Sequence, residues 1–131
     1  MSFDSKFLTC DQVVSLHQLQ IRQFGGAPGV KDEALLLSAL AQPEAGFDDQ
    51  YFHKDLFEMA AAYLFHLVKN HAFNDGNKRI AALTAAVFLE VNGISLTADE
   101  VEFEKVVLSA AQSLMTKSQI ADFFRNHSSI P

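Results

Sequence analysis

The chain has 131 residues, the usual size of one domain, and 49% of them are hydrophobic, which suffices for a folded core. Its formal net charge of −6 argues against a broad DNA- or RNA-binding surface, because phosphate contacts need clustered lysine and arginine. No apolar run is long enough to span a bilayer, and the first residues lack a signal-peptide pattern. We therefore expect a cytoplasmic protein without direct contact to nucleic acid or membrane.

The N-terminal part of the chain predicts two helices and one irregular segment. The capping-box pattern of residues 9–12, a Thr followed three residues later by a Gln, opens a helix that reaches about Phe24. The turn 25–29 ends this helix, because glycine adopts the left-handed cap and proline cannot continue a helix. A second helix covers about 32–41, and the aromatic, acidic segment 46–53 forms a loop or a short β-hairpin. The core side of the first helix is predicted to carry Val13, Leu16, Leu19 (or Gln20) and Phe24.

The third and fourth helices are predicted to form the centre of the fold. The third starts near Asp55 and runs to about Asn70 or beyond, and the fourth includes the apolar stretch 80–91. Glu58 is the only charge in the stretch 56–68, and Glu90 is the only charge in the stretch 80–91. Helices that are apolar nearly all round are usually buried. Because a short polar turn joins them, we expect an antiparallel central hairpin.

Two more capping-box patterns predict the C-terminal helices. Thr97 opens a fifth helix that reaches about Leu114, and Thr116 opens a sixth that reaches about His127. The predicted fold class is therefore all-α. We expect residues 1–131 to form a single domain, a compact six-helix bundle around the central hairpin. Segment 46–53 could add a short β-hairpin flap to this bundle.

The densest polar cluster lies in the turn between the two central helices, where residues 71–79 read His-Ala-Phe-Asn-Asp-Gly-Asn-Lys-Arg. The start of the fourth helix offers free N–H groups and a positive dipole end, and Lys78 and Arg79 add positive charge, so a phosphate can bind there. Asp75 can hold Mg²⁺, and His71 can take a proton from a hydroxyl near neutral pH. The turn therefore predicts transfer of a phosphate-containing group to a hydroxyl.

Plainer interpretations exist for the residues of this turn. Asn, Asp and Gly are ordinary turn residues, and Asn74 or Asp75 would cap the fourth helix in a non-catalytic adaptor too. A turn alone does not need His, Lys and Arg as well, which favours a catalytic site over a purely structural turn. A metal site on His66 and His71 is excluded, because their spacing puts them about 140° apart on a helix. No role is assigned to the remaining histidines, His17, His53, His66 and His127.

This turn resembles the motif of the Fic/Doc family, His-x-Phe-x-(Asp/Glu)-(Gly/Ala)-Asn-x-Arg. The matching residues are His71, Phe73, Asp75, Gly76, Asn77 and Arg79. The resemblance extends to the turn 24–29, the helix start 55–58 and the helix order, and covers nearly the whole chain. Fic members transfer AMP from ATP to a protein hydroxyl. The Doc (death-on-curing) branch contains toxins of type II toxin–antitoxin pairs that phosphorylate elongation factor Tu and inhibit translation.

Two positions place the chain nearer to the Doc branch. Typical Fic proteins have Gly and a second Arg where this chain has Lys78 and Ala82. Lys78 fills space that Gly leaves for the α-phosphate, and Ala82 removes a ligand of the inner phosphates. Both differences favour a kinase that transfers the γ-phosphate. Gly76 is the Fic-like residue and leaves AMP transfer as the alternative.

The resemblance also implies roles and partners. It makes His71 the base and Arg79 the group that stabilises phosphate charge, with ATP and Mg²⁺ as cofactors. Asp75 would position the Mg²⁺ or the target hydroxyl. Gly76, Asn77 and Lys78 would cradle phosphate, and Phe73 would anchor the loop. Phe47, Tyr51 and Phe52 would lie on a flap that pairs with the target. A cognate, Phd-like antitoxin would cover the approach to His71, and the target would be elongation factor Tu.

Overall fold

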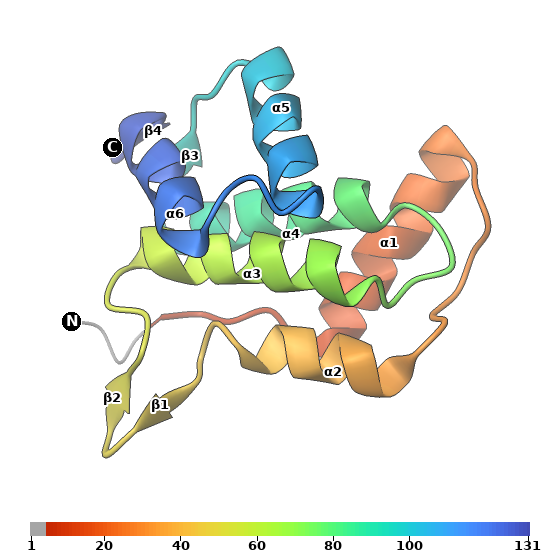
Figure 1. Ribbon diagram of the computed structural model, residues 1–131, viewed down its shortest axis with the longest axis horizontal. Coiled ribbons are helices and arrows are strands. Elements are labelled where there is room, and N and C mark those ends of the chain that lie inside the picture. The colour runs from red at the N-terminus through yellow and green to blue at the C-terminus, as the bar shows by residue number, and fades with distance from the viewer. Residues whose placement is uncertain (1–4) are drawn as a thin grey trace.

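Two largely apolar helices, α3 (Leu56–Asn70) and α4 (Asn77–Val91), lie at the centre of a computed structural model that describes residues 5–131 (Figure 1). They run antiparallel, and their inward faces are fully buried, with Tyr63, Leu64, Ile80 and Phe88 each 0% exposed. Burial of side chains of this size supplies the main stabilisation of the fold. The predicted central hairpin is confirmed.

The other helices pack around this pair: α1 (Cys10–Phe24), α2 (Glu33–Ala41), α5 (Glu100–Ala111) and α6 (Lys117–Asn126). In Figure 1, α2 lies below α3, while α5 and α6 lie above it. The predicted capping boxes at Thr9 and Thr116 are both formed. The all-α class is confirmed. Within the described residues, every helix is too short or too polar to traverse a bilayer.

The predicted capping box at Thr97 is wrong. The N-cap of α5 is Asp99, whose carboxylate accepts hydrogen bonds from the backbone N–H groups of Val101 and Glu102. Thr97 instead donates its hydroxyl hydrogen to the His127 carbonyl at 2.9 Å. Asp is at least as good an N-cap as Thr, and Asp99 directly precedes the first residue of α5, so Asp99 caps the helix. The helix also ends at Ala111, before the predicted end near Leu114.

Two pairs of short strands complete the fold. β1 (Gly46–Phe47) and β2 (Gln50–Tyr51) form an antiparallel hairpin, which decides between the two interpretations of segment 46–53. β3 (Ser95–Leu96) pairs with β4 (Ser128–Ser129), a contact that the sequence did not predict. Both strands of that pair are two residues long, too short for a periodic signal.

The inner face of α1 agrees with its prediction at Val13 and at Gln20, the alternative to Leu19, and differs from it at other positions. Val13, His17 and Gln20 are buried, whereas Leu19 and Phe24 are 54% and 55% exposed. The reason is that α1 packs in part against the polar loop between α3 and α4, so its buried side includes polar groups that bond to that loop.

Candidate active site

The loop between α3 and α4 begins and ends with left-handed residues. His71 is the C-cap of α3 with φ 52° and ψ 51°, and Gly76 is the N-cap of α4 with φ 72°. The left-handed turn takes His71 out of the helical stripe that the sequence analysis extended to it, and its side chain is exposed. The imidazole therefore faces solvent at the mouth of the central hairpin.

Asn77 closes this loop from inside. Its side-chain Oδ1 accepts from the Phe73 N–H, and its Nδ2 donates to the Phe73 carbonyl, both at 3.0 Å. Asn77 and Phe73 are 5% and 1% exposed. The side chain of Asn77 is thus engaged within the loop, and its backbone N–H is the group that remains for a phosphate.

The segment between α1 and α2 was predicted only as a helix stop. It lies along the loop between α3 and α4, which carries the motif residues and is called the motif loop below. The Asn74 N–H donates to the Gly29 carbonyl at 3.0 Å, and the Lys31 N–H donates to the Ala72 carbonyl at 2.8 Å. A β-carbon on Gly26 would lie 2.8 Å from Asp75 Oδ2, so glycine is required for this close approach. Residues 26–31 therefore help to hold the motif in place.

The carboxylate of Asp75 is held by two backbone groups. Oδ2 accepts from the Ala27 N–H at 3.1 Å, and Oδ1 accepts from the Gly76 N–H at 2.8 Å. The hydrogen bond from Ala27, followed by that from Gly76, lowers the pKa of Asp75 below its ordinary value, so the group stays ionised. Each oxygen keeps a further lone pair, and the side chain is exposed, which suits a Mg²⁺ ligand.

The N-terminus of α4 differs from the other helix starts among residues 5–131. Those helices carry side-chain N-caps, namely Thr9, Asp32, Asp55, Asp99 and Thr116. Gly76 provides none, and the first turn of α4 contains no acidic residue. Within the described chain, no protein acceptor is bonded to the backbone N–H groups of residues 77–79. These N–H groups and the helix dipole could hold an anion, and the exposed Lys78 and Arg79 flank them.

One pocket of about 730 Å³ joins these groups. The predicted residues that line it are His71, Asp75, Gly76, Asn77, Lys78 and Arg79. Its opposite wall comes from α1 and α5 and includes Phe24, Phe103, Val107 and Leu108. The Arg79 guanidinium lies 4.3 Å from the centre of the Phe24 ring, which fixes its direction. The pocket has the size of sites for small molecules and cofactors.

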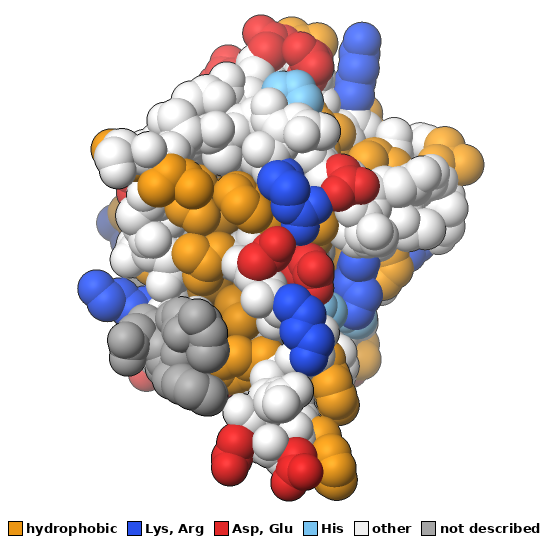
Figure 2. Space-filling model, turned by 90° about the vertical axis from the view of Figure 1, so that its left-hand side faces the viewer, with side chains coloured by type: hydrophobic (Ala, Val, Ile, Leu, Met, Phe, Trp, Pro, Cys, Tyr) orange, Lys and Arg blue, Asp and Glu red, His pale blue; other side chains and the backbone are white. Residues whose placement is uncertain are grey.

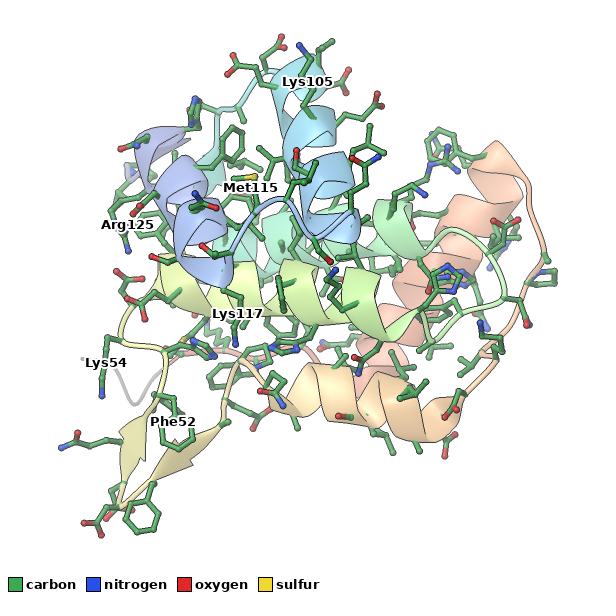
Figure 3. All side chains as sticks on the ribbon, viewed as in Figure 1. Phe52, Lys54, Lys105, Met115, Lys117 and Arg125 are labelled. Carbon is green, nitrogen blue, oxygen red and sulfur yellow. The ribbon has the colours of Figure 1, made fainter. Side chains whose placement is uncertain are left out.

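The predicted flap residues do not line this pocket. The β1–β2 hairpin precedes α3, whereas the motif follows it, and Figure 1 shows them at opposite ends of the helix, which has 15 residues and a length of about 22 Å. Phe47 and Phe52 are exposed, and Tyr51 lines a second pocket of about 590 Å³. Figure 3 shows Phe52 on the hairpin, and Figure 2 shows apolar side chains gathered on the molecular face at this end.

Two nearby residues were missed by the sequence analysis. Lys31 places Nζ 3.4 Å from His71 Nδ1, and no local pattern links residues 40 positions apart. His17 lies on α1, with Nε2 2.7 Å from the Asp75 carbonyl. For His17 a signal existed, because its spacing from Val13 and Gln20 puts it on the same helix face.

Comparisons with known proteins find one matching family and relatives of the chain. The sequence model of the Fic/DOC family matches residues 7–89, which include the whole motif loop. The chain is 31% identical to "Protein kinase doc" of Escherichia phage P1 over 120 residues, covering 92% of this chain and 94% of the relative. It is 45% identical to "Toxin Doc" of Mycolicibacterium smegmatis over 76 residues, covering 58% of each chain.

Proposed function

The chain belongs to the Fic/DOC family, and on this premise we propose that it transfers the γ-phosphate of ATP to a threonine or serine hydroxyl of a protein. The observation that carries the proposal is the uncapped start of α4, whose residues with free N–H groups line the same pocket as His71. The name of the phage relative, a protein kinase, supports the same reaction class.

In the proposed reaction, an unprotonated ring nitrogen of His71 takes the proton of the target hydroxyl. The hydroxyl oxygen then forms a bond to the γ-phosphorus, and the bond from that phosphorus to the bridging oxygen of ADP breaks. The N–H groups of the first α4 turn hold the phosphate oxygens, while Lys78 and Arg79 balance their charge. The phosphate on the target and ADP are the products.

Mg²⁺ fits the site through Asp75. This carboxylate is ionised and exposed, and Mg²⁺ usually binds through one or two carboxylates together with substrate phosphates. The described residues contain no cluster of three or more His, Cys, Asp or Glu that could hold a metal ion by themselves. Asp75 would hold the Mg²⁺, which would supply positive charge to neutralise the phosphates.

Lys78 and Ala82 support γ-phosphate transfer over AMP transfer. Both line the pocket, Lys78 as a charged chain at the anion site and Ala82 as an uncharged wall one turn later. Lys78 narrows the space in which an α-phosphate would react, and Ala82 offers no charge to the inner phosphates. AMP transfer, favoured by Gly76, is the alternative outcome of the test.

The test compares ATP labelled at the α or γ position with a purified protein target. We expect label from γ-ATP only, and none with His71→Asn, because asparagine tolerates the left-handed backbone of position 71 but is not a base. Lys78→Ala should lower transfer because it removes charge beside the bound phosphate, and Lys105→Ala, an exposed change on α5 labelled in Figure 3, is its matched control. Label from α-ATP only would establish AMP transfer, and no label from either would refute both reactions.

We further propose that the chain is the toxin of a toxin–antitoxin pair, with elongation factor Tu as target and a Phd-like antitoxin over the pocket. The name of the mycobacterial relative, Toxin Doc, supports the first part. Expression should stop growth and translation, and co-expression of the antitoxin should restore them. Growth arrest that persists with His71→Asn would instead indicate a non-catalytic binding protein.

A further inference from the structure

Two polar side chains on the inner face of α1 contact the backbone of the candidate site. His17 and Gln20 are 1% and 8% exposed and lie one helical turn apart. Their partners are main-chain carbonyl groups on either side of the first turn of α4, Asp75 before it and Arg79 at its end. Helix packing alone would be served by apolar residues, because burying polar groups costs free energy unless they are bonded.

The His17 contact fixes the position of Asp75. Its Nε2 lies 2.7 Å from the Asp75 carbonyl oxygen, and because a carbonyl only accepts, Nε2 must carry a proton. The ring also stacks on Phe73 with a centroid distance of 4.0 Å and an interplanar angle of 19°. One imidazole therefore holds the anchor residue and the peptide unit that leads into Gly76.

The Gln20 contact holds the other end of the same turn. Its Nε2 donates to the Arg79 carbonyl at 3.1 Å. Together the two donors hold the main chain on both sides of the free N–H groups of residues 77–79. Neither residue lines the pocket, so both act through the backbone rather than on a ligand.

We propose that His17 and Gln20 are positioning residues that set the direction of the phosphate-binding N–H groups of α4. The proposal rests on the proposed function, since it concerns the same phosphate. A displacement of reacting groups by about 1 Å can lower a rate about 100-fold, so loss of either donor reduces turnover without removing a catalytic group.

The first experiment measures kcat and KM for phosphate transfer. His17→Phe keeps the stacked ring but loses the donor, and Gln20→Leu keeps the volume but loses the amide. We expect kcat to fall roughly 10- to 100-fold in each. His17→Gln, which places an N–H donor near the same point, should restore most of the rate. Gln23→Leu, an exposed change on the same helix, should match the original protein.

Transfer by His17→Phe and Gln20→Leu at the original rate would overturn the proposal. If His17→Phe does not fold, as judged by circular dichroism, Gln20→Leu against Gln23→Leu decides. If the original protein transfers no label, the backbone ¹⁵N–¹H signals of residues 77–79 are followed during titration with MgATP. Weaker binding and shifted signals in His17→Phe, reversed in His17→Gln, would support positioning although the reaction had failed. Equal binding of MgATP by His17→Phe and His17→Gln would refute the positioning role.

Discussion

The side chain of Asn77 makes two hydrogen bonds with the backbone of Phe73, one with its N–H and one with its carbonyl. Both residues are buried, so water cannot replace either bond. The motif loop is therefore closed by its own asparagine, and its shape does not depend on a bound ligand.

Asn77→Leu should destabilise the protein by about 2–4 kcal/mol, because it leaves two buried backbone groups of Phe73 without partners. Urea unfolding measures the change. Asn74→Ala is the control within the same loop, since Asn74 is exposed and its side chain makes one hydrogen bond, to the Pro28 carbonyl. It should lose about 1 kcal/mol. Equal losses in the two variants would contradict the closing role of Asn77.

Gly26→Ala should reduce both stability and transfer activity. The added methyl group would lie 2.8 Å from Asp75 Oδ2, at a residue with φ of +114°, and would push the carboxylate away from the Ala27 N–H. Gly93→Ala has a similar positive φ of +86° but nothing within 4 Å of the new carbon. It should cost about 1–2 kcal/mol and leave the rate unchanged. An unchanged rate in Gly26→Ala would show that Asp75 tolerates displacement.

His66 should make stability depend on pH. Burial, and next the Lys117 ammonium 3.0 Å from Nε2, lower the pKa of His66 to about 4 from its ordinary 6.5. The unfolded state therefore binds more protons between these values, so the folded state loses stability as pH falls from 6.5 to 4 and no more below that. Figure 3 shows Lys117 at the start of α6, beside α3.

The measurement compares the free energy of unfolding of the original protein and His66→Gln at pH 7 and pH 4.5. The original protein should lose roughly 1–2 kcal/mol more than the variant over this range, after allowing for the partial exposure of His66. His53, whose pKa is also lowered by burial, contributes a dependence common to both proteins. Parallel pH curves would refute the assignment to His66.

Lys31→Met should lower kcat for phosphate transfer roughly 10-fold. An ammonium group only donates, so Nδ1 of His71 is the unprotonated nitrogen in this contact. A hydroxyl that gives its proton to Nδ1 must displace the ammonium, and we expect the displaced positive charge to help balance the charge of the transferred phosphate. Lys31→Arg should keep part of the rate, and Lys105→Met should keep all of it. A faster Lys31→Met would mean that Lys31 blocks the base instead.

The helices could be predicted because their signals are local. Thr9 and Thr116 stand next to the residues that they cap, and the apolar stretches of α3 and α4 are continuous in sequence. Where two local signals competed, as with Thr97 and Asp99, the prediction chose the more distant cap. The predicted cap at Asn74 or Asp75 was also wrong, since Gly76 occupies that position.

The candidate site could be predicted in part for the same reason. Its motif residues are contiguous, so chemistry and resemblance pointed to them without a structure. The supports come from other parts of the chain: His17 is 58 positions from Asp75, and Lys31 is 40 positions from His71. The spacing of His17 could have placed it on the buried face of α1, but the partners of both residues become visible only once the helices are packed.

The first turn of α4 belongs to the core and to the pocket at once. Asn77 and Ile80 are buried, whereas Lys78 and Arg79 between them are exposed to the pocket. A change in the backbone of this turn would expose the hydrophobic core. An inhibitor that acted by changing this backbone would therefore have to unfold part of the protein. We therefore expect the proposed antitoxin to inhibit the protein by covering the pocket. Activity should return in full as soon as the antitoxin dissociates.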